Sequence, residues 1–134
     1  MIERITADNI LLALILRRNF NKKGGNFVTA QENPLQLGIF KYNPGEIIRP
    51  HNHRRINRHI KTTQEILYIV RGKVKVDLFF KNKRIVSKIL KEGDTILLAN
   101  GGHGFKFLSD TEILEVKQGP YIDKGTDKRY LKIR

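Results

Sequence analysis

Residues 65–98 read EILYIVRGKVKVDLFFKNKRIVSKILKEGDTILL, and this stretch decides the fold class. It holds three apolar runs rich in β-branched and aromatic residues, at 65–70, 73–80 and 84–90, and a fourth at 94–98. The second and third runs are separated by Lys81-Asn82-Lys83, a polar connection typical of a β-hairpin. Short runs of this kind, bounded by turn residues, predict antiparallel strands.

The same pattern continues on both sides of this stretch. Turn residues separate strand candidates at roughly ten-residue spacing, which is typical of an all-β sandwich or barrel. The candidates are residues 10–16, 27–30, 37–42, 46–53, 103–108 and 111–117. Residues 10–16 are apolar throughout, so periodicity alone does not separate a buried strand from a buried helical turn there. No other segment shows a helical period.

Composition narrows the class of protein further. A length of 134 residues predicts one domain, residues 1–134, and the absence of cysteine excludes disulfides, thiolate metal ligands and cysteine nucleophiles. The net charge of +13 favours anionic partners. Nucleic acid is an unlikely one, because no recognised nucleic-acid motif accompanies the cations. A small phosphate- or carboxylate-bearing molecule and a merely solvated basic surface both remain open.

The apolar run at residues 10–16 does not predict a membrane protein. Acidic residues precede it, Arg17 and Arg18 close it, and no small-residue cleavage site follows. It is also much shorter than a membrane-spanning helix requires. We therefore expect a cytoplasmic protein without a membrane partner.

Three histidines and one glutamate are candidate metal ligands. On a strand, residues two apart project from the same face, so His51 and His53 can converge on one ion. Glu65 begins a later strand candidate and His103 begins another, so neighbouring strands add a carboxylate and a third imidazole. This donor set suits one divalent ion of zinc, iron, nickel, copper or manganese and leaves positions for water or substrate. Taken singly, each residue is as well explained by a loop, turn or solvated position.

The order of these residues resembles the two motifs of the cupin superfamily. The first motif is matched by Gly45, His51, His53, Glu65 and Gly72, and the second by Gly93, Ala99, Asn100, Gly101 and His103. The resemblance implies a double-stranded β-helix, the cupin jelly-roll barrel, with one divalent metal ion on His51, His53, Glu65 and His103. This sequence departs from the first motif by a basic insertion at residues 54–64. It departs from the second motif by Ala99 in place of proline, by a gap between Gly101 and His103 that is one residue short, and by Phe107 where asparagine is common.

Such a barrel has further implications for its interior. His103, Phe105 and Phe107 would share one strand face, and Glu65, Leu67 and Ile69 another, so an apolar cavity would lie beside the ligands. Residues 113–121 also resemble the last strand of small bacterial cupins of sugar and surface-polysaccharide biosynthesis. The resemblance implies carbohydrate biosynthesis and a homodimer, and a charged C-terminal tail follows from about residue 121.

We consider three functions. The leading one is a metal-dependent enzyme, an isomerase or epimerase or else an oxygenase, acting on a small anionic sugar-derived or carboxylated substrate. The second is a metal-independent nucleotide-sugar isomerase or epimerase with His51 or His53 as the general base. The third is a non-catalytic ligand-binding or metal-sensing module. The sequence assigns no catalytic or substrate-binding residue, and it identifies neither the metal nor the substrate.

Overall fold

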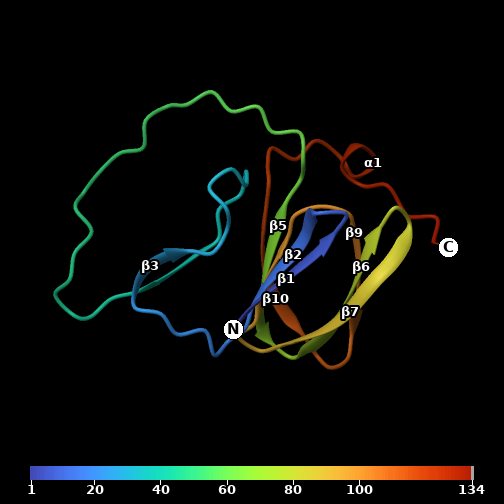
Figure 1. The fold of residues 1–134 in the computed structure, drawn as a ribbon, viewed down its shortest axis with the longest axis horizontal. Helices are drawn as coiled ribbons and strands as arrows, with labels where there is room; N and C mark the ends of the chain where they lie inside the picture. Colours follow the sequence, from blue (N-terminus) through green and yellow to red (C-terminus); the bar gives the residue numbers. More distant parts are fainter. Residues whose placement is uncertain (134) are drawn as a thin grey trace. The chain divides into compact units, whose positions relative to one another are not determined.

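The computed structural model describes residues 1–133 and is all-β, as predicted (Figure 1). The described residues form ten strands and a single four-residue helix. Contacts between Cα atoms divide the chain into two compact units. Unit 1 comprises Met1–Phe20 and the residues from Thr62 onward, and unit 2 comprises Asn21–Lys61. The expectation of one domain over residues 1–134 stays a prediction.

Unit 1 contains a five-stranded sheet in which every neighbouring pair is antiparallel. Its strands, in spatial order, are β1 (Ile2–Ala7), β2 (Ile10–Leu16), β8 (Thr95–Leu98), β5 (Glu65–Arg71) and β10 (Glu112–Lys117). Strand β2 is buried from Leu12 to Leu16, which explains why its sequence is apolar without alternation.

The second sheet of unit 1 has three antiparallel strands in the order β7-β6-β9. Their bounds are β6 (Lys73–Phe80), β7 (Lys83–Lys91) and β9 (Gly102–Phe107). The predicted hairpin between β6 and β7 is confirmed. Its turn residues Lys81 and Asn82 have φ angles of 52° and 61°, as the two-residue turns that match strand twist require.

The core lies between these two sheets. It combines fully buried side chains of one sheet, such as Ile15, Ile69 and Ile96, with Val74, Val76 and Leu78 of the other. Strands β5 and β6 alternate between buried residues that face this core and more exposed residues on the other face, as expected of antiparallel sheets packed on one side.

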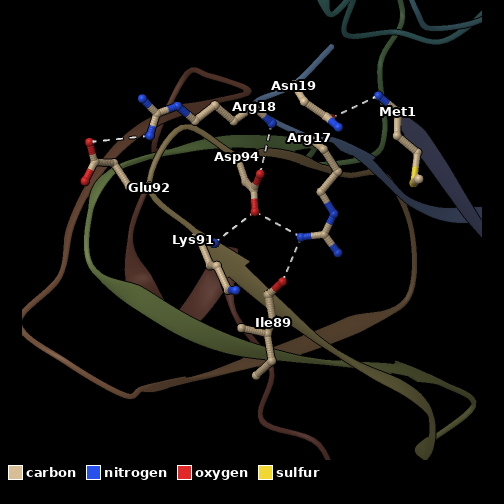
Figure 2. Close-up of a pocket in the computed structure, with 8 residues that line it drawn as sticks. All are labelled: Met1, Arg17, Arg18, Asn19, Ile89, Lys91, Glu92 and Asp94. Carbon is tan, nitrogen blue, oxygen red and sulfur yellow. Dashed lines mark hydrogen bonds and ion pairs between the residues drawn. The ribbon is translucent and has the colours of Figure 1, made fainter.

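A partly buried ion-pair network centred on Asp94 joins the two sheets at one end of unit 1. Asp94 Oδ2 accepts hydrogen bonds from Arg17 Nη1 and from the Lys91 backbone N–H, both at 2.9 Å. Its Oδ1 accepts one from the Arg18 backbone N–H at 3.0 Å. Arg17 also donates to the carbonyl of Ile89 in β7. Figure 2 shows the hollow beside this network.

Unit 2 is built around a two-stranded antiparallel hairpin of β3 (Gly24–Phe27) and β4 (Gly38–Lys41). The rings of Phe27 and Phe40 meet edge to face, with centroids 5.5 Å apart. Each ring lies over the glycine opposite it on the neighbouring strand. The strand predicted at 27–30 therefore lies three residues earlier, because the glycines accommodate the rings.

The strand predicted at residues 46–53 is wrong, because the structure has no strand or helix at residues 42–64. Pro50, within the predicted strand, lacks the backbone N–H that a sheet ladder needs. His51 and His53 consequently lie in an irregular, exposed segment.

The chain continues after β10 into a single helical turn, α1 (Lys124–Asp127). Asp123 caps this turn by accepting hydrogen bonds from the Thr126 N–H at 2.7 Å and from its hydroxyl at 2.9 Å. These hydrogen bonds lower the pKa of the Asp123 carboxyl, and the bond from the Thr126 N–H has the largest effect. Among residues 1–133 no helix has the length and apolar character needed to span a membrane.

Candidate functional site

Unit 1 contains a cavity of about 900 Å³. Strands β5, β9 and β10 contribute its walls, together with the β6–β7 turn and the C-terminal segment 127–131, which appears in red in Figure 1. Most of the residues predicted to line such a cavity do so: Glu65, Leu67, His103, Phe105 and Phe107. The prediction is wrong for Ile69, which is fully buried in the core between the sheets. The volume suits a small molecule of the size of a sugar derivative.

Glu65 and His103 contact each other in this cavity. Glu65 begins β5 between Leu98 and Lys117 of the flanking strands, and His103 projects from β9 in the other sheet. His103 Nε2 lies 3.3 Å from Glu65 Oε2, and the side chains are 33% and 13% exposed. Two of the four predicted metal ligands, more than thirty residues apart in sequence, are thus brought together.

The environment of Glu65 favours its ionised form. The hydrogen bond from His103 lowers the pKa of the Glu65 carboxyl, and the positive charges of His103, Lys117 and Lys128 act in the same direction. Partial burial opposes them by raising the pKa, but the net shift is downward. A carboxylate held ionised beside an imidazole suits either metal ligation or proton transfer.

The distance between these two donors fits a shared metal ion. Ligand atoms about 2.1 Å from an ion are separated by roughly 3.0 Å at an octahedral right angle and by roughly 3.4 Å at a tetrahedral angle. The observed 3.3 Å falls within this interval. A hydrogen bond between the two groups gives a similar separation, so the distance fits both a hydrogen-bonded pair and two ligands of one ion.

His51 and His53 lie close to each other within unit 2. Their ring centroids are 5.2 Å apart and their planes are inclined at 70°. His51 Nδ1 is 2.8 Å from the carbonyl oxygen of Arg49, to which an N–H at this position would donate. This arrangement leaves Nε2 of His51 available as a ligand, which is how metal-binding histidines are commonly oriented.

The structure therefore presents the four predicted ligands as two pairs, one in each unit. Within residues 1–133 it contains no group of three or more His, Asp or Glu side chains arranged to hold a metal ion. The complete four-ligand site stays a prediction.

Sequence reasoning missed the contribution of the C-terminal segment to the cavity. Lys117 Nζ lies 3.2 Å from Asp127 Oδ2, and this hydrogen bond raises the pKa of the Lys117 ammonium. Lys128, Arg129, Tyr130 and Leu131 follow Asp127 along the cavity wall. The available sequence signal was Asp123, three residues before Thr126, a spacing typical of a helix N-cap.

A comparison with protein-family models finds no match, and neither a comparison with curated protein sequences nor one with solved structures finds any.

Proposed function

We propose that the chain is a metal-binding cupin enzyme, a double-stranded β-helix that acts on a small anionic sugar-derived or carboxylated molecule. The contact between Glu65 and His103 inside the cavity is the observation that carries this proposal. Both residues match cupin motif positions, and their donor atoms are spaced as two ligands of one ion would be. His51 and His53 supply the other two ligands in this proposal.

A divalent ion at these residues would polarise a carbonyl or hydroxyl oxygen of the substrate as a Lewis acid. The rest of the cavity suits the remaining parts of such a molecule. Phe105, Phe107 and Leu67 offer apolar surface to a ring, and Glu115 offers a hydrogen-bond acceptor for hydroxyl groups. An isomerisation or epimerisation fits this arrangement, and with iron the same site would support an oxygenase. A cytoplasmic location, a homodimer and a role in carbohydrate biosynthesis complete the proposal.

Metal analysis of untagged protein tests the proposal. We expect near-stoichiometric metal after reconstitution with zinc, iron, nickel or manganese, and its loss in both His51→Ala and His103→Ala. The matched control is His59→Ala, since His59 belongs to unit 2 but not to the predicted ligand set. A wild-type protein that binds none of these ions contradicts the metal site.

A second candidate function is favoured by the same contact. His103 hydrogen-bonded to an ionised Glu65 is arranged as a general base oriented by a carboxylate, so a metal-independent isomerase or epimerase would use His103 for proton transfer. The sequence pointed to His51 or His53 for this role. Activity that survives a strong chelator and depends on His103 would select this candidate.

A further inference from the structure

The C-terminal segment is anchored to unit 1 at two places. The Lys117–Asp127 ion pair fixes its beginning to β10. Its end is fixed by Leu131, which packs so closely over Gly102 of β9 that a Cβ atom there would lie 2.5 Å from Leu131 Cδ1. Residues 128–130 therefore run along the cavity wall, between the contact of Asp127 with β10 and the contact of Leu131 with β9.

Lys128 and Arg129 of this anchored segment form no salt bridge with the acidic residues among 1–133, although the charge of Lys128 reaches Glu65 across the cavity. The cavity is lined by Lys81, Lys128 and Arg129, and Lys81 is paired with Asp8 at 3.2 Å. Asp127, the acidic residue next to Lys128, is occupied by Lys117. Lys128 and Arg129 remain available to an anion, and the net charge of +13 attracts one.

The cavity walls formed by β5, β9 and β10 carry acidic, imidazole and aromatic side chains instead of cations. Glu65, His103 and Glu115 supply polar groups from β5, β9 and β10, whereas Phe105 and Phe107 supply aromatic faces. A ligand that satisfies every wall has an anionic group, hydroxyl groups and a compact ring or chain. Sugar phosphates and sugar acids combine these features.

We propose that Lys128 and Arg129 bind the phosphate or carboxylate group of a sugar-derived ligand, while its hydroxyl groups face Glu65, His103 and Glu115. The C-terminal segment is then the anion-binding wall of the site. This inference rests on the proposed function for the chemistry at Glu65 and His103, and it adds the class of substrate and the residues that recognise it.

Calorimetric titration of the metal-reconstituted protein tests this inference. The probes are glucose 6-phosphate and glucuronate, which separate phosphate from carboxylate, with inorganic phosphate and uncharged glucose for comparison. We expect one of the two anionic sugars to bind more tightly than glucose and than inorganic phosphate. In Lys128→Ala and Arg129→Ala its affinity falls about tenfold or more each, as expected for the loss of a charged hydrogen bond.

The matched control is Lys132→Ala, because Lys132 belongs to the same tail and is exposed but does not line the cavity. We expect its affinity to equal that of the wild type, and the metal content of all three variants to be unchanged. The weakening should also diminish at high salt, since the lost contact is electrostatic.

Two outcomes overturn the inference and leave the metal site intact. One is metal-loaded protein that binds neither anionic sugar better than glucose. The other is equal affinity in the wild type, Lys128→Ala and Arg129→Ala. Failure to load metal contradicts the proposed function instead, and the same titrations of the metal-free protein then decide whether the C-terminal wall binds anions.

Discussion

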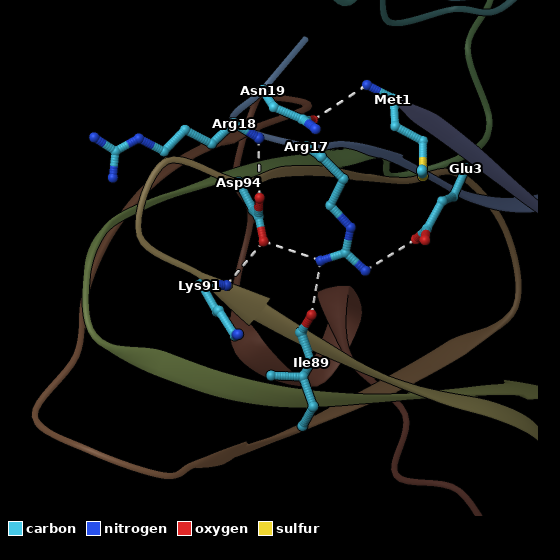
Figure 3. Close-up of polar contacts among 8 residues, drawn as sticks. All are labelled: Met1, Glu3, Arg17, Arg18, Asn19, Ile89, Lys91 and Asp94. Carbon is cyan, nitrogen blue, oxygen red and sulfur yellow. Dashed lines mark hydrogen bonds and ion pairs between the residues drawn. The ribbon is translucent and has the colours of Figure 1, made fainter.

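Replacement of Asp94 by alanine should destabilise unit 1 more than any single surface substitution. The Asp94 side chain is 8% exposed, and it accepts hydrogen bonds from the Arg17 guanidinium and from the backbone N–H groups of Arg18 and Lys91. Figure 3 shows these contacts together with the second ion pair of Arg17, to Glu3. The network links the end of β2 to the β7–β8 turn, so its loss affects both sheets.

The magnitude follows from the number of bonds lost and from what remains. Breaking a buried ion pair by removing one partner costs about 3–5 kcal/mol. Arg17 keeps its contacts with Glu3 and with the Ile89 carbonyl, so it does not become an isolated charge. We therefore expect the lower end of this range, about 3 kcal/mol, for Asp94→Ala. Asp94→Asn keeps one oxygen acceptor and should cost roughly half as much.

Urea unfolding followed by circular dichroism measures these differences, with the denaturant midpoint converted through a common m-value. Glu3→Gln is the control, because Glu3 is 26% exposed and a partly exposed pair contributes less than about 1 kcal/mol. A cycle with Arg17→Met should give a coupling energy above about 1 kcal/mol. An Asp94→Ala cost below about 1 kcal/mol with an unchanged m-value would refute the reasoning.

Three further predictions follow from the structure. Gly72→Ala should lower the free energy of unfolding, measured by urea melts, by more than about 2 kcal/mol. The reason is that Gly72 has a φ of +94° and that the new Cβ would lie 2.3 Å from the Asp110 carbonyl oxygen. An unchanged free energy of unfolding would contradict that turn geometry. The pKa of Asp123 lies below the usual aspartate value of 3.8, so its cap is retained above that value and lost as the pH falls through the lower folded pKa. The Thr126 amide NMR signal should therefore shift only below about pH 3.8, and this shift should be absent in Asp123→Asn. Metal at a free concentration of a hundred times its Kd should stabilise the folded protein by about 2.7 kcal/mol. Calorimetry should show this as a rise in Tm of roughly 10 °C, and the rise should be absent in His103→Ala.

The elements that sequence reasoning placed correctly are those with local signals. Residues 73–80 alternate, and they are followed by a polar turn that tolerates positive φ, so both the β6–β7 hairpin and its bounds were predictable. The apolar run at 10–16 was ambiguous by period, and the structure shows a strand buried on both faces. Strand β1 was missed because only Ile5 among its residues is buried, so its sequence carries little pattern.

The candidate site was predictable only in part, for a physical reason. The contact of Glu65 with His103 follows from strand faces and motif spacing, both of which are readable from the sequence. The position of residues 127–131 depends instead on one ion pair to Lys117 and on one close contact with Gly102, and neither has a local sequence signature. The irregular segment that carries His51 and His53 likewise follows no periodic pattern.

The division of the four predicted ligands between the units gives the two candidate functions different requirements. A metal-independent proton transfer by His103 needs Glu65 to orient the imidazole, and both residues belong to unit 1. The metal centre that we propose also requires the imidazoles of His51 and His53, which belong to unit 2. A double variant, His51→Ala with His53→Ala, therefore distinguishes the two once a substrate is known. Turnover that persists in the double variant assigns the chemistry to the His103–Glu65 pair. If the variant instead loses both turnover and bound metal, but still binds a sugar phosphate or sugar acid at Lys128 and Arg129, the chemistry is assigned to the ion.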